Sequence, residues 1–126
     1  MKTKLCQILW LLGTVLFLSC QSKPKSDITK IDKTFLQENV IEKEVQLVDV
    51  RTSEEYESGH IEGAVNYNII DSQRFLTQIE NLDKEEPVYL YCKMGERSDR
   101  AAKLLKEKGF TKIFDYSGGY NDWVSD

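Results

Sequence analysis

The chain is poor in the residues that mark several protein classes, with two prolines, one histidine and three cysteines among its 126 residues. Two prolines and seven glycines exclude collagen-like, proline-rich and low-complexity chains, and no internal repeat is visible. Basic residues are also outnumbered, because the chain has 17 Lys and Arg and 21 Asp and Glu, which gives a net charge of -4. Without a basic face to neutralise phosphates, we expect no nucleic-acid partner.

The rest of the composition is that of an ordinary globular protein, with 40% hydrophobic and 30% charged residues. Because a domain takes roughly 100–200 residues, there is room for one domain and no second. A chain of this length can bury a core without a disulfide framework.

The single long apolar run, residues 8–18, is too short to span a membrane, since a spanning helix needs about 17–25 residues. Lysines precede the run, so we predict a signal peptide over 1–19, with an uncleaved signal anchor as the alternative. The end of the run, Phe17-Leu18-Ser19-Cys20, resembles a bacterial lipobox, although Leu is more usual where Phe17 stands. That resemblance implies that Cys20 is acylated and becomes the first mature residue.

Residues 20–27 are polar, contain a proline and have no apolar period, which indicates a flexible tether between a lipid-anchored Cys20 and a domain over 28–126. Removing residues 1–19 takes away two lysines and no acids, so the mature charge becomes (17 − 2) − 21 = −6. We expect the domain in the bacterial cell envelope, facing the periplasm. Gln21 follows the anchor where an Asp would resemble an inner-membrane retention signal, which favours the outer membrane.

Three cysteines are present, and the predicted processing leaves one thiol in the exported domain. Cys6 leaves with the signal peptide and Cys20 carries the lipid, so Cys92 has no partner for a disulfide. A lone thiol in that compartment is either buried and inert or retained for chemistry. One cysteine and one histidine do not supply the usual ligands of a metal site, so we expect no metal.

The hydrophobic pattern alternates between periods typical of strands and helices, which predicts an α/β domain with a mainly parallel central sheet flanked by helices. Strands are expected at 28–31, 45–50, 64–69, 88–91 and 112–116. Helices are expected at 33–43, after Thr52 or Ser53 as far as Gly59, from Asp71 or Ser72 through Leu82, and at 97–108, with a short terminal turn ending near Trp123.

Cys92 stands where a buried strand meets the strongest predicted helix. Ligand sites of open α/β sheets lie at the carboxyl ends of strands. Gly95 permits a tight loop whose backbone N–H groups turn inward, and the helix end adds partial positive charge. Lys93 and Arg97 add two full positive charges, partly offset by Glu96, so we expect the Cys92 thiol to ionise readily. The alternative is a buried structural cysteine.

The chain resembles the rhodanese family of sulfurtransferases over residues 28–123, and the order and spacing of the matches make the resemblance specific. The matching residues are Leu47-Val48-Asp49-Val50-Arg51, Glu55-Tyr56, Gly59-His60-Ile61, Gly63-Ala64, Asn66, Tyr91-Cys92, Gly95, Arg97-Ser98, Ala101, Gly118-Gly119 and Trp123. One departure is Glu62, where the family commonly has Pro.

The resemblance implies a single rhodanese-like domain in which Cys92 takes sulfane sulfur from a donor such as thiosulfate and passes it from a persulfide to cyanide or a thiol. It also implies an anion-binding loop formed by Lys93, Met94, Gly95, Glu96 and Arg97. This chemistry needs no metal, nucleotide or organic cofactor. A thiolate that is already formed needs no general base to attack sulfur.

Two other functions stay open. The first is a membrane-tethered persulfide carrier or binding module that serves a protein sulfur acceptor. The second is a cysteine-dependent phosphatase. Phosphatases of the same fold resemble a pattern with five residues between Cys and Arg, and only four separate Cys92 from Arg97. The shorter loop therefore favours sulfur over phosphate chemistry.

Several polar residues outside the loop invite a functional interpretation. Asp49 and Arg51 flank the end of a central strand, and Arg51 is a candidate for binding substrate, with an ion pair or loop hydrogen bonds as the alternative. His60 is interpreted as a packed residue that holds a loop rather than as a general base. Ser98 is interpreted as a helix cap rather than as a nucleophile.

Overall fold

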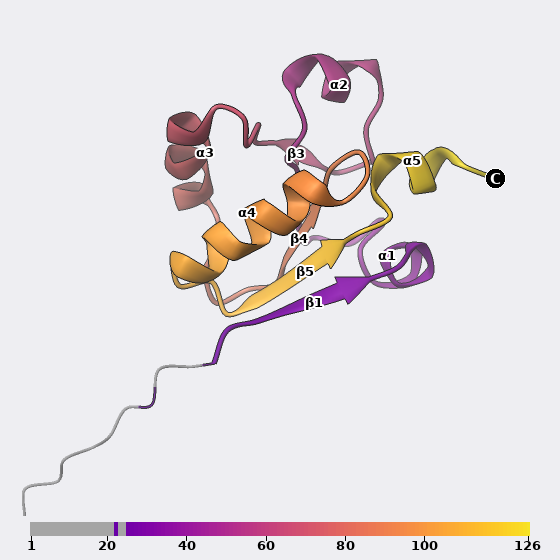
Figure 1. Cartoon of the computed structure of the whole chain (residues 1–126). Helices are drawn as coiled ribbons and strands as arrows, with labels where there is room; N and C mark the ends of the chain where they lie inside the picture. Colours follow the sequence, from indigo (N-terminus) through magenta and orange to yellow (C-terminus); the bar gives the residue numbers. More distant parts are fainter. Residues whose placement is uncertain (1–21, 23–24) are drawn as a thin grey trace, which may run out of the picture.

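The computed structural model describes residues 22 and 25–126, which Figure 1 traces from the first strand to the C-terminal helix. The predicted signal peptide, 1–19, and the predicted lipid anchor at Cys20 lie outside the described residues. Across 22 and 25–126, no helix has the length and apolar character needed to cross a membrane.

The centre of the fold is a sheet of five parallel strands in the order β1-β5-β4-β2-β3. The central strand β4 is buried along its whole length and apolar on both faces, as expected where helices cover both sides of a sheet. The prediction of an α/β domain with a parallel sheet is confirmed. The strand bounds are β1 Asp27–Ile31, β2 Gln46–Asp49, β3 Val65–Asn66, β4 Val88–Tyr91 and β5 Lys112–Tyr116.

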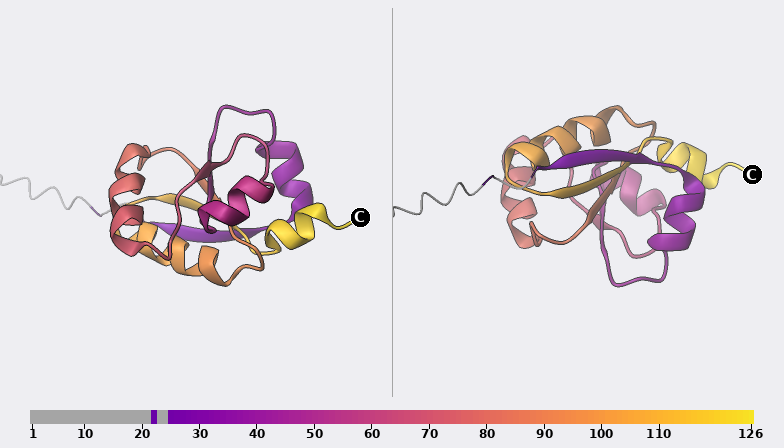
Figure 2. Two further views of the ribbon diagram at one scale, coloured as in Figure 1. Left: turned by 90° about the horizontal axis from the view of Figure 1, so that it is seen from above. Right: turned by 90° about the horizontal axis from the view of Figure 1, so that it is seen from below.

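Helices cover both faces of this sheet, and Figure 2 shows α4 and α1 on opposite sides of it. The helices α3 and α4, with a short 3-10 turn at Ile79–Asn81, pack on one face, while α1, α2 and α5 lie on the other. The helix bounds are α1 Lys33–Asn39, α2 Ser53–Ser58, α3 Ser72–Gln78, α4 Glu96–Glu107 and α5 Gly119–Val124.

Alternation along the inner strands divides the core into two layers. Along β4, Leu90 faces the layer that contains α4, whereas Tyr89 and Tyr91 face the layer that contains α1. This period of two is the geometry of a strand with both faces buried. Cys92, the next residue, belongs to the α4 layer.

Three segments in which helices or turns are predicted differ from the structure in length or type. The first helix ends at Asn39 rather than 43, and Glu42 just beyond it has a positive φ of 61°. The α3 helix also ends early, because its last turn tightens into the 3-10 turn. The predicted terminal turn is a regular helix, α5.

The predicted strand 64–69 contains only two residues of regular strand. Beyond Asn66 the chain still runs beside β2, since the N–H of Tyr67 donates to the Asp49 carbonyl at 2.9 Å and that of Ile69 to Val50 at 3.1 Å. At the edge of the sheet, the chain turns through Asn68, whose side chain accepts from the Ile70 N–H. The apolar pattern therefore predicted the burial of this segment but not its shape.

Because all strands are parallel, the segments that follow β2, β4 and β5 emerge at the same end of the sheet, where the strands have their carboxyl ends. These segments are the beginning of α2, the Cys92 loop and the beginning of α5, which lie near one another in Figure 1. Open α/β sheets hold ligands at this carboxyl end of their strands.

Candidate active site

Cys92 is the first residue after the central strand β4, and its side chain is almost wholly buried, with 1% exposed. It is the free cysteine of the described chain. The buried strand fixes the position of the thiol, since Tyr91 before it is anchored by its own hydroxyl, which donates to Asp49 and accepts from the Ile61 N–H.

The loop after Cys92 turns its backbone toward the sulfur. Gly95 donates its N–H to Sγ of Cys92 over 3.0 Å, which stabilises negative charge on that sulfur. The loop needs glycine here because Gly95 has φ of 101°, and because an added Cβ would lie 2.5 Å from the Ser117 carbonyl oxygen. The predicted glycine-containing loop is therefore present and close to the thiol.

The α5 helix holds the same loop from the other side. The N–H of Tyr120 donates to the Cys92 carbonyl at 2.8 Å, and the N–H of Asn121 donates to the Lys93 carbonyl at 3.1 Å. Gly119, with φ of 68°, allows the two segments to come this close. The α5 helix thus satisfies two carbonyls of the Cys92 loop, a contact that sequence reasoning missed.

Ser98 lies in the first turn of α4, directly against the thiol. Its hydroxyl donates to the Gly95 carbonyl at 3.2 Å and lies 3.6 Å from the Cys92 sulfur. The prediction that Ser98 caps the helix is wrong, because Gly95 occupies the N-cap position. Ser98 is fully buried, so it supports both the loop and the sulfur.

Arg97 forms a two-pronged ion pair with Glu55 of α2. The Nη1 and Nη2 atoms of Arg97 donate to the two carboxylate oxygens at 2.6 and 3.0 Å. Hydrogen bonding from Arg97 lowers the pKa of Glu55 from its ordinary value near 4.5 to about 2, and bonding to Glu55 raises the pKa of Arg97. Paired geometry of this kind is stronger than a single contact.

We expect this ion pair to make stability depend on acid in a defined way. Because the pKa of Glu55 is lowered in the folded protein, its contribution is complete above pH 4.5 and is lost as pH falls through about 2. The stability advantage of wild type over Glu55→Gln should therefore shrink between about pH 5 and pH 2. Urea unfolding at several pH values measures it, with Glu54→Gln as matched control. A constant difference over this range contradicts the expectation.

Arg51 lies beside the site but is already paired. Its guanidinium donates to both carboxylate oxygens of Asp49 and, at 2.7 Å, to the Gly59 carbonyl, while the centre of the Tyr120 ring lies 4.2 Å from its central carbon. Burial lowers the pKa of Arg51, and the bond to Asp49 outweighs it, so the net direction is upward. The structure thus places Arg51 in the ion pair that was the alternative to substrate binding.

An open pocket of about 200 Å³ lies over the thiol, and the five residues that line it are four of the predicted loop residues and Cys92 itself. The side chain of Met94 is 67% exposed, whereas the thiol is buried beneath. Gly95 and Arg51 do not line this pocket, although the Gly95 N–H contacts the sulfur. The lining residues are Cys92, Lys93, Met94, Glu96 and Arg97.

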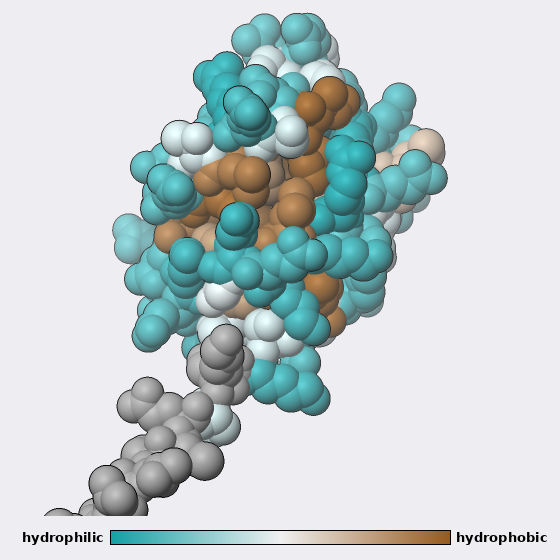
Figure 3. Space-filling model, turned by 60° about the vertical axis from the view of Figure 1, so that its left-hand side comes forward, coloured by the Kyte–Doolittle hydropathy of each residue, from teal (hydrophilic) through white to brown (hydrophobic). Residues whose placement is uncertain are grey.

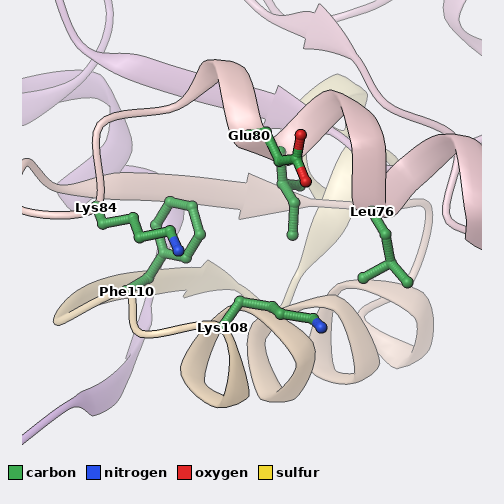
Figure 4. Close-up of a pocket in the computed structure, with 6 residues that line it drawn as sticks. Leu76, Glu80, Lys84, Lys108 and Phe110 are labelled. Atoms are coloured by element: carbon green, nitrogen blue, oxygen red, sulfur yellow. The ribbon is translucent and has the colours of Figure 1, made fainter.

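A second hollow, of about 100 Å³, lies between the 3-10 turn and the end of α4, toward the amino ends of the strands (Figure 4). Lys84 extends over the ring of Phe110, with its ammonium 5.8 Å from the ring centre. Figure 3 views the molecule from the side of α3, and hydrophobic residues gather there between polar ones. This hollow contains no thiol, whereas Cys92 itself lines the pocket described above.

Two further predictions concern His60 and metals. The ring of His60 stacks on Tyr56 with centroids 3.8 Å apart, and its Nδ1 contacts the Tyr56 carbonyl at 2.9 Å. It does not line the thiol pocket, and its contacts with Tyr56 support the loop-holding role, although the residue is exposed rather than packed in the interior. Within the described ranges, no group of three or more potential metal ligands is present.

The structure defines an α/β protein whose parallel sheet presents one thiol in a glycine-containing loop at the carboxyl end of a central strand. Comparison with known families agrees with this class. The chain belongs to the rhodanese-like domain family, whose model matches residues 32–126.

Two curated relatives are similar in sequence. The thiosulfate sulfurtransferase GlpE of Shewanella oneidensis is 36% identical over 81 residues, covering 64% of this chain and 77% of that protein. The putative sulfur carrier protein YrkF of Bacillus subtilis is 31% identical over 104 residues, covering 82% of this chain. The chain spans 55% of the length of YrkF, so similarity is confined to part of that protein.

Solved structures show the same fold. A rhodanese-like domain protein from Staphylococcus aureus is 28% identical, with a TM-score of 0.68, and the match covers 78% of this chain and 93% of that one. The predicted family and its α/β fold are therefore confirmed, and the chain has sulfurtransferases among its relatives.

Proposed function

We propose that this protein is a sulfurtransferase that takes sulfane sulfur from thiosulfate, or a similar small anionic donor, onto Cys92 and passes it to cyanide or a thiol. The observation that carries the proposal is the hydrogen bond from the Gly95 N–H to the Cys92 sulfur at the base of an open pocket. A donated N–H stabilises a thiolate, and a thiolate is the form of cysteine that attacks sulfur. The similarity to GlpE supports thiosulfate as donor.

The proposed cycle has two displacements on sulfur. The Cys92 thiolate attacks the terminal sulfur of thiosulfate, the sulfur–sulfur bond of the donor breaks, and sulfite leaves with the electron pair. The product is a persulfide anion on Cys92. Cyanide then attacks the outer sulfur and leaves as thiocyanate, which restores the thiolate. Both steps transfer one sulfur atom without an added oxidant or reductant.

Residues of the loop would bind the donor and the leaving group. Lys93 lines the pocket and is exposed, so its ammonium can meet an incoming anion. The start of α4 adds the partial positive charge of a helix N-terminus. The Gly95 N–H that now contacts sulfur is placed to support the persulfide as well.

The mass of a fragment from Ser22 to Asp126 tests the proposal directly. Incubation with thiosulfate should add the mass of one sulfur atom, and subsequent cyanide should remove it with release of thiocyanate. Iodoacetamide should alkylate the loaded protein on its outer sulfur. The adduct should therefore be heavier, by one sulfur atom, than the adduct of the unloaded protein. No mass gain with thiosulfate would reject thiosulfate as the donor.

A persulfide carrier for a protein partner is the second candidate. The observations that favour it are the similarity to the putative sulfur carrier YrkF and the 67% exposed Met94 at the pocket rim. An exposed apolar side chain next to a reactive group suits contact with another protein surface. Slow turnover with cyanide and thiols, beside rapid transfer to a co-purified protein, would identify the carrier.

We further propose that the protein is exported and anchored through a lipid on Cys20 in the cell envelope. The proposal is supported by the short apolar run at 8–18 and the lipobox-like Phe17-Leu18-Ser19-Cys20. The first strand starts at Asp27, which lies at the amino end of the parallel strands, whereas Cys92 follows the carboxyl end of β4. The tether would therefore leave the domain away from the Cys92 pocket. Loss of membrane association in Cys20→Ala would support the anchor, and unchanged association would reject it.

A further inference from the structure

The charges at the mouth of the Cys92 pocket balance one another. Two cations, Lys93 and Arg97, and one acid, Glu96, line the pocket, and Glu55 neutralises Arg97 from outside the lining. Two positive and two negative charges therefore meet at the mouth. Among the described residues, Lys93 forms no ion pair. Arg97, in contrast, is bonded to Glu55 through both of its terminal nitrogens.

Glu55 is fixed in this position by its own helix. It occupies the third position of α2 and forms a capping box with Thr52, in which the Glu55 N–H donates to the threonine hydroxyl at 3.2 Å. The threonine hydroxyl donates in turn to Oε1 of Glu55, also at 3.2 Å. The carboxylate side chain is 29% exposed, so part of it lies out of water. Glu55 therefore acts on Arg97 as a fixed charge rather than a mobile one.

We propose that Glu55 is a specificity-determining residue that matches the pocket to sulfane donors with one negative charge. Organic persulfides and thiosulfonates belong to this class, whereas thiosulfate carries two negative charges. This inference rests on the proposed function, because it concerns the donor that loads Cys92. Without Glu55 the mouth would carry one excess positive charge and would favour the dianion.

The physical argument is the Coulomb interaction between the mouth and the donor. One unit of charge at roughly 8 Å, with an effective dielectric constant of about 40, changes binding about fivefold per unit of donor charge. A dianion therefore gains about 25-fold and a monoanion about fivefold when Glu55 loses its charge. The selectivity between the two donors then shifts by about fivefold.

Methanethiosulfonate and thiosulfate form a matched pair of donors for this test. In each, the Cys92 thiolate attacks the terminal sulfur, and the bond to the oxidised sulfur breaks. The electron pair leaves with methanesulfinate in one case and with sulfite in the other. Both reactions form the same persulfide anion, so the charge of the donor is the main difference between them.

The experiment compares wild type and Glu55→Gln, as full chains in detergent, for kcat/KM with each donor at about 20 mM salt. Gln keeps one oxygen that can accept from Arg97, and it removes the charge together with one of the two hydrogen bonds. We expect the ratio of thiosulfate to methanethiosulfonate kcat/KM to rise about fivefold in Glu55→Gln. The difference should decline at about 500 mM salt, because salt screens charge at this range.

Glu54→Gln is the matched control, since it removes the same charge from the same helix but from an exposed residue, whereas the bonds of Arg97 go to Glu55. Its donor ratio should remain within about twofold of wild type. An equal loss of activity with both donors in Glu55→Gln would show that Glu55 only supports structure, and would overturn the inference. If wild type accepts sulfur from neither donor, the proposed function fails instead.

The salt dependence of wild type gives a second test that needs no variant. With charges balanced at the mouth, kcat/KM for thiosulfate should change less than about threefold between 20 and 500 mM salt. A decline of tenfold or more would indicate an uncompensated cation in the pocket, and would also overturn the inference.

Discussion

Replacement of Cys92 by serine is expected to abolish sulfur loading and to lower thiocyanate formation by about 1,000-fold or more. The hydroxyl of serine is not ionised near neutral pH and is a poor nucleophile toward sulfur, so the first displacement does not occur. Folding should persist, because serine is similar in size and its neighbour Ser98 can share a hydrogen bond with it. Intact mass after thiosulfate and a thiocyanate assay measure both outcomes.

Ser98→Ala is the matched control for the loss at Cys92. Ser98 contacts the sulfur at 3.6 Å and supports the Gly95 carbonyl, so its removal should slow the reaction by less than about tenfold. The variant should still gain one sulfur atom. Sulfur gain by Cys92→Ser would show that another group carries the sulfur, and would remove Cys92 from the mechanism.

Gly119→Ala is expected to destabilise the protein by about 3–5 kcal/mol and to lower turnover by about tenfold or more. An added Cβ at Gly119 would lie 2.7 Å from the Cys92 carbonyl oxygen and closer still to the carbonyl of Lys93. Backbone atoms cannot move aside as a flexible side chain can, so α5 must shift away. The shift would break the hydrogen bonds from Tyr120 and Asn121 to the loop.

Gly63→Ala separates the clash from the cost of a positive φ. Gly63 has φ of 85°, comparable to Gly119, but an added Cβ there meets nothing within 4 Å. The control should therefore lose only about 1 kcal/mol and keep its turnover. Urea unfolding and steady-state rates of the two variants give the comparison. Equal losses at the two glycines would show that α5 does not constrain the Cys92 loop.

The strand that delivers Cys92 and the helix that follows it could be predicted from the sequence because their signals are local. The run Val88-Tyr89-Leu90-Tyr91 is apolar on both faces, and Gly109 lies just beyond the end of α4, where φ is 92°. The last strand, Lys112–Tyr116, has the bounds that the pattern predicts. Buried runs and glycine stops depend only on neighbouring residues, so periodicity detects them.

The charge at the pocket could not be predicted in the same way. The sequence indicates two positive charges, Lys93 and Arg97, partly offset by Glu96. The ion pair of Arg97 joins residues separated by 42 positions, and no local pattern links them. The spacing of Thr52 and Glu55 does signal a capping box, but it does not show that the same carboxylate also reaches Arg97.

The sequence by itself determined the α/β class, the family, and the thiol in a glycine-containing loop at the end of a buried strand. Only the tertiary structure decided which charges are neutralised, that Arg51 is bound to Asp49, and that α5 supports the loop through Tyr120. The physical reason is the range of the interactions. Hydrophobic periodicity and turn preferences depend on a few neighbouring residues. Ion pairs and loop contacts, in contrast, form only when the folded sheet brings distant segments together at the carboxyl ends of its strands.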